Sequence, residues 1–388
     1  MNTAAPAAMT TTAPGVSPGL WTLAWRRLRA DKIAMVAMTI VGLFLLMLVA
    51  SATGLIASDW EDEVGVNYAP PTFLGAQSTV AIDATAGAGS DPAAVAADQL
   101  AAVPDNPVDP LADVIRELRG QLGNTSAPPI VDDTGVADPL AKEIAELRTS
   151  LKQAGADQTY VRKATLPFGA DKWGHDIIKK TIKGAETSIV VGLVAALVAT
   201  VLGTLFGALA GYHGKWVDDI FTWFYNIFTS IPSILMILTV AAVLQKKGVM
   251  TIVLILGLTG WTGAYRLIRA EYMKHKAREY VMAADAIGAS SMRKMFSHIF
   301  PNVSHVALVQ MSILVVGFIK AEVILSFLGF GVPVGVVSWG SMLNEAQNEL
   351  ILGRWWQLAA ASAAMAVLVT AFSLFTDALR DALDPKLK

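Results

Sequence analysis

The chain has 388 residues, of which 54% are hydrophobic and only 16% are charged, and its formal net charge at pH 7 is -2. A soluble protein of this length carries about 25% charged residues, so the composition excludes an ordinary water-soluble enzyme. The near-neutral charge excludes a strongly basic nucleic-acid-binding protein, and the lack of cysteine excludes disulfides and thiolate metal sites. We therefore predict a protein that faces membrane lipid.

The N-terminal part of the chain contains three segments of different composition: a tail, an amphipathic segment and an apolar run. Residues 1–19 are rich in Ala, Thr and Pro and are expected to be disordered. Residues 20–56 are expected to form an amphipathic segment followed by a first transmembrane helix. Ala50-Ser51-Ala52 resembles a signal-peptide cleavage site, but the apolar run before it exceeds the roughly 7 to 15 residues of a secretory signal. We interpret this run as an uncleaved membrane span.

Long windows without Asp, Glu, Lys or Arg recur along the chain. A helix needs about 20 apolar residues to cross a bilayer. Five such windows are uninterrupted, and a sixth contains only Lys320 and Glu322. The sequence therefore predicts an all-α membrane protein with six transmembrane helices. The windows cover residues 33–56, 187–211, 220–244, 249–265, 306–328 and 355–376.

Basic residues beside the spans predict their orientation. Four Lys or Arg residues lie between positions 26 and 32, before the first span, and acidic residues follow it. The positive-inside rule therefore places the N-terminus in the cytoplasm, and six spans return the C-terminus to the same side. The segment 266–305 carries seven basic and three acidic residues and falls on the cytoplasmic side as well. Lys246 and Lys247, in a short external turn, are the exception.

Residues 57–184 form the expected extracytoplasmic insert, with 19 acidic and 11 basic residues. The segments 109–122 and 138–151 repeat each other, with nine of fourteen positions identical. Each begins with Asp-Pro, which suits a helix N-cap and first turn. We predict two short amphipathic helices that pack on each other or on the membrane domain. A docking surface for a soluble partner is the alternative.

Small residues and one proline mark the spans of the expected core, residues 185–388. Gly203, Gly207 and Gly211 form a stripe at four-residue spacing, which is typical of closely packed membrane helices. Pro232 removes one backbone hydrogen bond and predicts a kink, which serves packing or acts as a gating hinge.

Lys320 and Glu322 are charged residues inside a span, where charge costs at least a few kcal/mol unless it meets water or a partner. Residues two apart point to different sides of a helix, so these two cannot neutralise each other. Lys320 either extends toward the membrane interface or, like Glu322, contacts a transport pathway or another subunit. No phosphate-binding loop, metal-ligand spacing or nucleophile motif occurs, so we expect no catalytic residue, metal or cofactor on this chain.

The cytoplasmic segment 266–305 contains a predicted short helix from Tyr280 to Ile287. Ala283 and Ala284 make it thin, and Gly288 is expected to end it. A thin helix can enter a groove on a partner. An amphipathic loop on the lipid headgroups is the alternative that the residues alone leave open.

This segment resembles the E-A-A-x-x-x-G…P loop of permease subunits in binding-protein-dependent ABC importers. Ala283-Ala284, Gly288 and Pro301 match the motif, and Met282 stands where the motif has Glu. Further stretches look like the C-type subunit of the dipeptide/oligopeptide branch, and together the resemblance covers residues 20–56 and 165–388. These stretches are residues 166–171, 211–218, 280–284, 325–331, 338–343 and 377–385.

The resemblance implies a bacterial inner-membrane subunit that forms half of a translocation path for di- or oligopeptides. Its implied partners are a second similar permease, two ATP-binding subunits that hold ATP and Mg²⁺, and an external solute-binding protein that delivers cargo near Ser326–Asn344. Nickel, glutathione or a peptide-like antibiotic are alternative cargoes. An ion-coupled secondary transporter using Lys320 and Glu322, and a membrane-anchored scaffold acting through the insert, are alternatives of other classes. The implied ATPase-coupling residues are Glu279, Tyr280, Ala283, Ala284, Asp285, Gly288 and Pro301.

Overall fold

The computed structural model describes residues 20–75, 162–333 and 335–383. The repeated segments predicted at 109–122 and 138–151, and the tail 1–19, lie outside the described residues. Within the described residues the regular elements are helices. Isolated β-bridges connect the segment 63–71 to the segment 163–175, and one further bridge pairs Ala170 with Asp176. The chain is therefore all-α, as the apolar windows predict.

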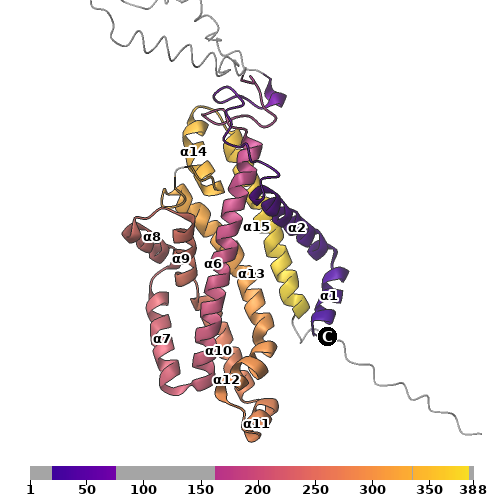
Figure 1. The fold of residues 1–388 in the computed structure, drawn as a ribbon, viewed down its shortest axis with the longest axis vertical. Coiled ribbons are helices and arrows are strands. Elements are labelled where there is room, and N and C mark those ends of the chain that lie inside the picture. The colour runs from indigo at the N-terminus through magenta and orange to yellow at the C-terminus, as the bar shows by residue number, and fades with distance from the viewer. Residues whose placement is uncertain (1–19, 76–161, 334, 384–388) are drawn as a thin grey trace, which may run out of the picture. The chain divides into compact units, whose positions relative to one another are not determined.

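Figure 1 labels the helices in chain order. Asp31 caps α2, because its carboxylate accepts hydrogen bonds from the amides of Ile33 and Ala34. The elements are α1 (Leu20–Ala30), α2 (Lys32–Ala52), the 3-10 turn η1 (Thr72–Leu74), α6 (Ile177–His213), α7 (Lys215–Ser230), α8 (Ser233–Leu244), α9 (Val249–Thr259), α10 (Thr262–Lys276), α11 (Glu279–Ala286), α12 (Ser291–Arg293), the π-helix η3 (Lys294–Ile299), α13 (Phe300–Phe327), α14 (Trp339–Ile351) and α15 (Trp356–Leu383).

Five helical stretches in the described residues are long and apolar enough to cross a membrane, and a bent pair supplies a sixth. The five stretches are Lys32–Ala52, Ile177–His213, Val249–Lys276, Ser291–Phe327 and Trp356–Leu383. The six predicted spans are confirmed in this sense.

The third predicted span, 220–244, is not a single straight helix. It consists of α7 and α8, which meet at an angle of 86°. α7 ends at Ser230, and Pro232 directly precedes α8, because proline lacks the amide hydrogen that would continue α7. Pro232 is exposed at this break. Between the predicted spans 187–211 and 220–244, only Gly214 separates α6 from α7.

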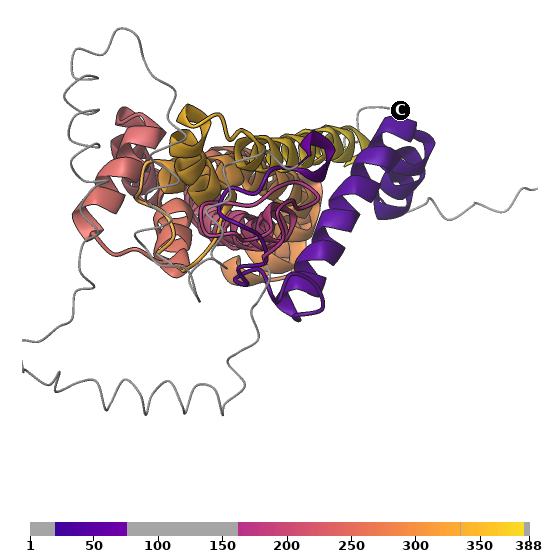
Figure 2. The same ribbon diagram turned by 90° about the horizontal axis from the view of Figure 1, so that it is seen from above.

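The central helix of the bundle is α6, which packs mainly against α10, α13 and α9. The α7–α8 pair and the α1–α2 pair lie on opposite sides of it (Figures 1 and 2). α6 begins at Ile177, ahead of the boundary expected at 185. The residues before it pack with those after α2 in a small buried cluster formed by Ala69, Leu166 and Ala170.

The three glycines of the predicted stripe line the contact of α6 with α10. A Cβ atom on Gly203 would lie 2.6 Å from the carbonyl oxygen of Trp261, and one on Gly207 would lie 2.8 Å from that of Tyr265. A Cβ atom on Gly211 would lie 2.6 Å from the carbonyl oxygen of Arg269. The two backbones therefore approach closely because these positions have no side chain.

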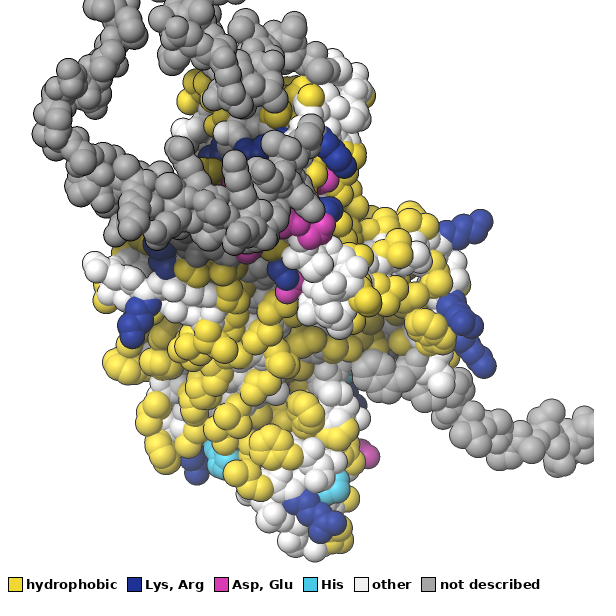
Figure 3. Space-filling model, turned by 45° about the horizontal axis from the view of Figure 1, so that its top comes forward, with side chains coloured by type: hydrophobic (Ala, Val, Ile, Leu, Met, Phe, Trp, Pro, Cys, Tyr) yellow, Lys and Arg dark blue, Asp and Glu magenta, His cyan; other side chains and the backbone are white. Residues whose placement is uncertain are grey.

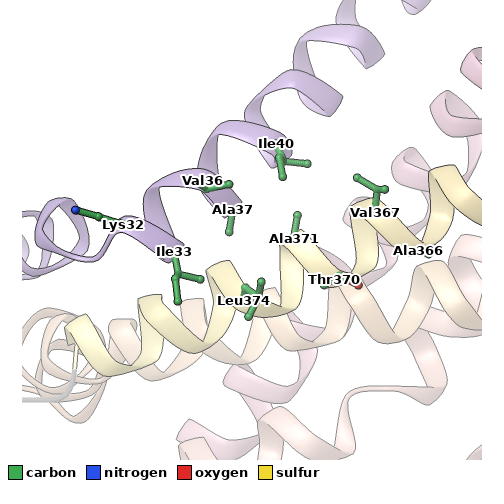
Figure 4. A pocket seen from close by; sticks show the side chains of 10 residues that line it. All are labelled: Lys32, Ile33, Val36, Ala37, Ile40, Ala366, Val367, Thr370, Ala371 and Leu374. Atoms are coloured by element: carbon green, nitrogen blue, oxygen red, sulfur yellow. The ribbon is translucent and has the colours of Figure 1, made fainter.

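Apolar side chains dominate the described surface of the face in Figure 3, as expected for contact with lipid. A groove of about 600 Å³ runs between α2 and α15 (Figure 4). Among its lining residues, Ile33, Val36, Val367 and Leu374 are large and apolar. Apart from Lys32 and Thr370 the lining is apolar, so the groove suits lipid tails.

Candidate functional site

The segment that the sequence singled out folds around α11, at the opposite end of the bundle from α14 (Figure 1). Val281 and Ala284 are buried, and Val281 packs in a cluster with Ile268. The other side of the helix is exposed: Met282 is 56% exposed, and Ile287, the residue after the helix, is 84% exposed. α11 therefore presents an apolar surface that the described residues leave uncovered.

Gly288 makes the turn that ends α11. Its φ is +79°, in the left-handed region that favours glycine, and its amide donates to the carbonyl of Asp285 at 2.9 Å. No atom lies within 4 Å of where a Cβ would stand. The turn thus needs glycine for its backbone conformation, and the space around it is open.

Two polar contacts hold the α11 segment to its neighbours. The Lys294 ammonium on η3 donates to the carboxylate of Asp285 and lowers the pKa of that carboxyl group. Nδ1 of His275, on α10, lies 2.9 Å from the hydroxyl of Tyr280. Burial raises the pKa of Tyr280, so this hydroxyl keeps its proton at neutral pH. The segment is therefore fixed to helices on both sides.

The structure brings six of the seven predicted coupling residues into α11 and its turn, and places Pro301 in the first turn of α13. The segment 266–305 is largely helical and not an extended loop. α10 continues to Lys276, and a second helical stretch starts at Ser291 and runs through α12, η3 and α13 to Phe327. The six residues are Glu279, Tyr280, Ala283, Ala284, Asp285 and Gly288.

Glu322 lies in the interior of the bundle with no exposed surface. Its Oε2 accepts a hydrogen bond from Ser188 of α6 at 2.6 Å, and its Oε1 accepts one from Ser326 at 2.7 Å. Ser188 also accepts from the backbone amide of Trp339, at the start of α14, at 3.3 Å. Glu322 therefore joins α13 to α6 and, through Ser188, to α14.

Lys320 lies on the opposite, exposed side of α13. In the part of the chain that the structure describes, no carboxylate forms an ion pair with it. The two charged residues of this span thus have different surroundings. Glu322 is buried among serine hydroxyl groups, and Lys320 is exposed on the surface of the helix.

A buried charged network at the α14 end is not evident from the sequence. The Lys180 ammonium donates to Oδ2 of Asp171 at 2.7 Å and to Oε2 of Glu345 at 2.6 Å. Burial by itself raises the pKa of Asp171, but Lys180 and His175 outweigh it, so the pKa is lowered and the carboxylate stays ionised. Lys180 and its partners come from α6, the loop before it and α14. No periodicity links Lys180 to a residue 165 positions away.

Glu349 of α14 lies beside this network and is only 1% exposed. Neither carboxylate oxygen of Glu349 has a hydrogen-bond partner of good geometry among the described residues. The backbone amide of Lys172 lies near this carboxylate. Burial raises the pKa of Glu349 to about 7, and the charges of Asp171 and Glu345 also raise it, against the effect of Lys180. This carboxyl group therefore titrates near neutral pH.

We expect the stability of the protein to depend on pH through Glu349. Its pKa of about 7 exceeds the value of 4.5 for a free glutamate, so the folded state binds this proton more tightly. The contribution is complete below about pH 4.5 and is lost as pH rises through about 7, with a size of up to about 3 kcal/mol. Glu349→Gln should flatten the decline in melting temperature of purified protein between about pH 5 and about pH 9.

Glu61→Gln is the matched control, because Glu61 is exposed. It should leave the pH profile of the wild type unchanged. An identical decline in the Glu349→Gln variant and the wild type would show that another group causes it.

Comparison with known proteins gives two family-model matches. Residues 203–388 match the binding-protein-dependent transport system inner membrane component, and residues 19–71 match the N-terminal TM domain of oligopeptide transport permease C. The chain is 34% identical over 238 residues to the dipeptide transport system permease protein DppC of Bacillus subtilis, covering 61% of this chain and 74% of that protein. The chain belongs to this permease family.

One further relative agrees with this assignment. The oligopeptide transport system permease protein OppC of Bacillus subtilis is 36% identical over 221 residues, which span 57% of this chain and 72% of that protein. A chain of the MetNI methionine ABC transporter, solved in inward facing conformations, matches with a TM-score of 0.36 and 16% identity, over 49% of this chain and 97% of its own. The chain is thus a multi-pass inner-membrane permease subunit of a dipeptide/oligopeptide ABC importer, and permease subunits of this family are non-catalytic.

Proposed function

We propose that this chain forms half of the translocation path of an ATP-driven importer that carries di- or oligopeptides. Its partners are a second similar permease, two ATPase subunits that bind ATP and Mg²⁺, and a solute-binding protein that delivers the peptide. The observation that carries the proposal is α11, a short helix with an uncovered apolar surface at one end of the bundle. The names of the relatives support peptides as the cargo.

The orientation follows from charge. The basic residues before α2 and those around α11 belong on the cytoplasmic side, where the ATPases act. The N- and C-termini then lie in the cytoplasm, and α14, the network around Lys180 and residues 57–176 lie outside. In this orientation α14 faces the solute-binding protein, and α11 faces the ATPases.

The mechanism depends on a rigid connection between α11 and the membrane. Val281 is buried against neighbouring helices, and the Asp285–Lys294 pair ties α11 to η3, which continues into α13. Each ATPase subunit holds α11 in a groove on its surface. When the ATPases close on ATP, this groove moves α11, and α11 moves the helical stretch from Ser291 to Phe327. Such rigid shifts open the path alternately to the two sides.

A secondary transporter is less consistent with the geometry. Ion coupling by Lys320 and Glu322 needs both groups at one site, but they lie on opposite sides of α13. Peptide uptake into vesicles reconstituted with this chain, the second permease, the ATPases and the binding protein distinguishes an ABC importer from a secondary transporter. The proposal requires peptide uptake that stops without ATP, whereas uptake driven by an ion gradient alone contradicts it.

Ile287→Asp should weaken the binding of the ATPase subunits. Ile287 is 84% exposed and a charged side chain there leaves the fold intact, but it places a carboxylate in an apolar contact. We expect at least about tenfold less ATPase co-purified with the permease pair, because desolvating an unpaired polar group costs about 1–3 kcal/mol or more. Ile351→Asp, at the other end and 83% exposed, is the matched control and should retain the ATPases. Equal recovery from both variants would mean that α11 does not form the contact.

A further inference from the structure

The exposed side of α13 carries one stripe of residues with a lysine in its middle. Ile313, Gly317, Lys320 and Ile324 follow one another at spacings of four, three and four residues, and so share one face of the helix. Ile313 and Ile324 are 44% and 42% exposed. No atom lies within 4 Å of the Cβ position of Gly317, so the stripe has open space one turn from Lys320.

A lysine in this position needs an anion that the described chain does not supply. Glu322, the nearest acidic residue in the sequence, points into the bundle and is bound by Ser188 and Ser326. A charged side chain that faces lipid in a span is costly unless it reaches the interface, which favours a stripe that faces water or another molecule.

Lys320 lies close to one end of α13. α13 ends at Phe327, seven residues later, so Lys320 lies about 10 Å below the end of the helix at 1.5 Å per residue. In the proposed orientation this is the external end, where the binding protein delivers its cargo. Every unmodified linear peptide carries a carboxylate at its C-terminus, and the open space at Gly317 lets a peptide backbone approach the helix.

We propose that Lys320 binds the C-terminal carboxylate of the peptide as it leaves the binding protein and enters the path. This inference rests on the proposed function and adds the chemical group that the permease itself recognises. A charge-assisted hydrogen bond from the ammonium gives the interaction its strength. The same contact orients the peptide with its C-terminus toward α13.

The test compares a dipeptide with its C-terminal amide in vesicles that contain the complete importer. The binding protein can itself prefer one of the two, so the quantity measured is the ratio of their uptake rates, compared between permease variants with the same saturated binding protein. We expect Lys320→Met to lower the acid-to-amide ratio about tenfold, Lys320→Arg to keep it, and Ile324→Met, the control on the same stripe, to leave it unchanged.

A different partner for Lys320 would give a different result. If Lys320 pairs with an acidic residue of the second permease, Lys320→Met weakens assembly of the permease pair and reduces uptake of both peptides equally. If it only extends to lipid phosphate, the variant keeps both rates. Either result overturns the inference. Wild-type vesicles that show no ATP-dependent uptake of either peptide would instead contradict the proposed function, so the two failures are distinguishable.

Discussion

Replacing Gly203 with valine is expected to prevent the bundle from folding. A Cβ atom there would lie 2.6 Å from the carbonyl oxygen of Trp261, 2.6 Å from the Cβ of Ala264 and 2.9 Å from the amide nitrogen of Tyr265. Two of these are backbone atoms of α10 or of the residue that precedes it, so relief requires α6 and α10 to separate. Overpacking of this kind costs about 1–3 kcal/mol per site and sometimes more, and here it acts on the central helix pair.

The measurement is the yield of monodisperse protein and its melting temperature in detergent. Gly203→Ala should lower the melting temperature, and Gly203→Val should give little folded protein. Gly42→Val in α2 is the matched control, because no atom lies within 4 Å of its Cβ position. Similar yield and stability for the two valine variants would contradict the close contact between α6 and α10.

Lys180→Met is expected to destabilise the α14 end of the bundle strongly. The variant leaves the carboxylates of Asp171 and Glu345 without their shared cation, and Asp171 has no exposed surface. Removing one partner of a buried ion pair costs about 3–5 kcal/mol, because an uncompensated charge stays buried. The neighbouring pair between Lys179 and Asp59 is partly exposed, and Lys179→Met should cost no more than about 1 kcal/mol.

A further variant separates lost charge from lost packing. The triple change Lys180→Met, Asp171→Asn and Glu345→Gln removes all three charges and should recover part of the stability lost in the single variant. Denaturant or thermal unfolding in detergent gives the comparison. A triple variant less stable than Lys180→Met alone, or equal losses from Lys179→Met and Lys180→Met, would contradict a buried network of this kind.

Local patterns in the sequence predict much of the fold. Apolar windows locate the spans, because hydrophobic length is a property of consecutive residues. The stripe of Gly203, Gly207 and Gly211 indicates a close helix contact, since positions four apart share a face. The helix around Tyr280 and its end at Gly288 can also be predicted, because composition and the need for a left-handed turn are local features.

The remaining features depend on residues distant in the sequence. The break before Pro232 is not evident from the apolar window 220–244. Proline predicts a kink, but the residues that pack around it determine the angle between α7 and α8. The network of Asp171, Lys180 and Glu345 joins three segments, and Lys180 by itself resembles any basic residue that flanks a span. The exposure of Ile287 is likewise not predictable, because exposure at a helix end depends on which residues pack against that helix.

The helical stretch from Ser291 to Phe327 is 37 residues long, which corresponds to a length of roughly 55 Å. A helix of this length exceeds the roughly 30 Å hydrocarbon core of a bilayer. A tilt of about 5° about its α11 end moves its other end by roughly 5 Å, about the distance between neighbouring turns of a helix. In the proposed function, the ATPases therefore need only a small rotation of α11 to change the width of an opening on the far side of the membrane.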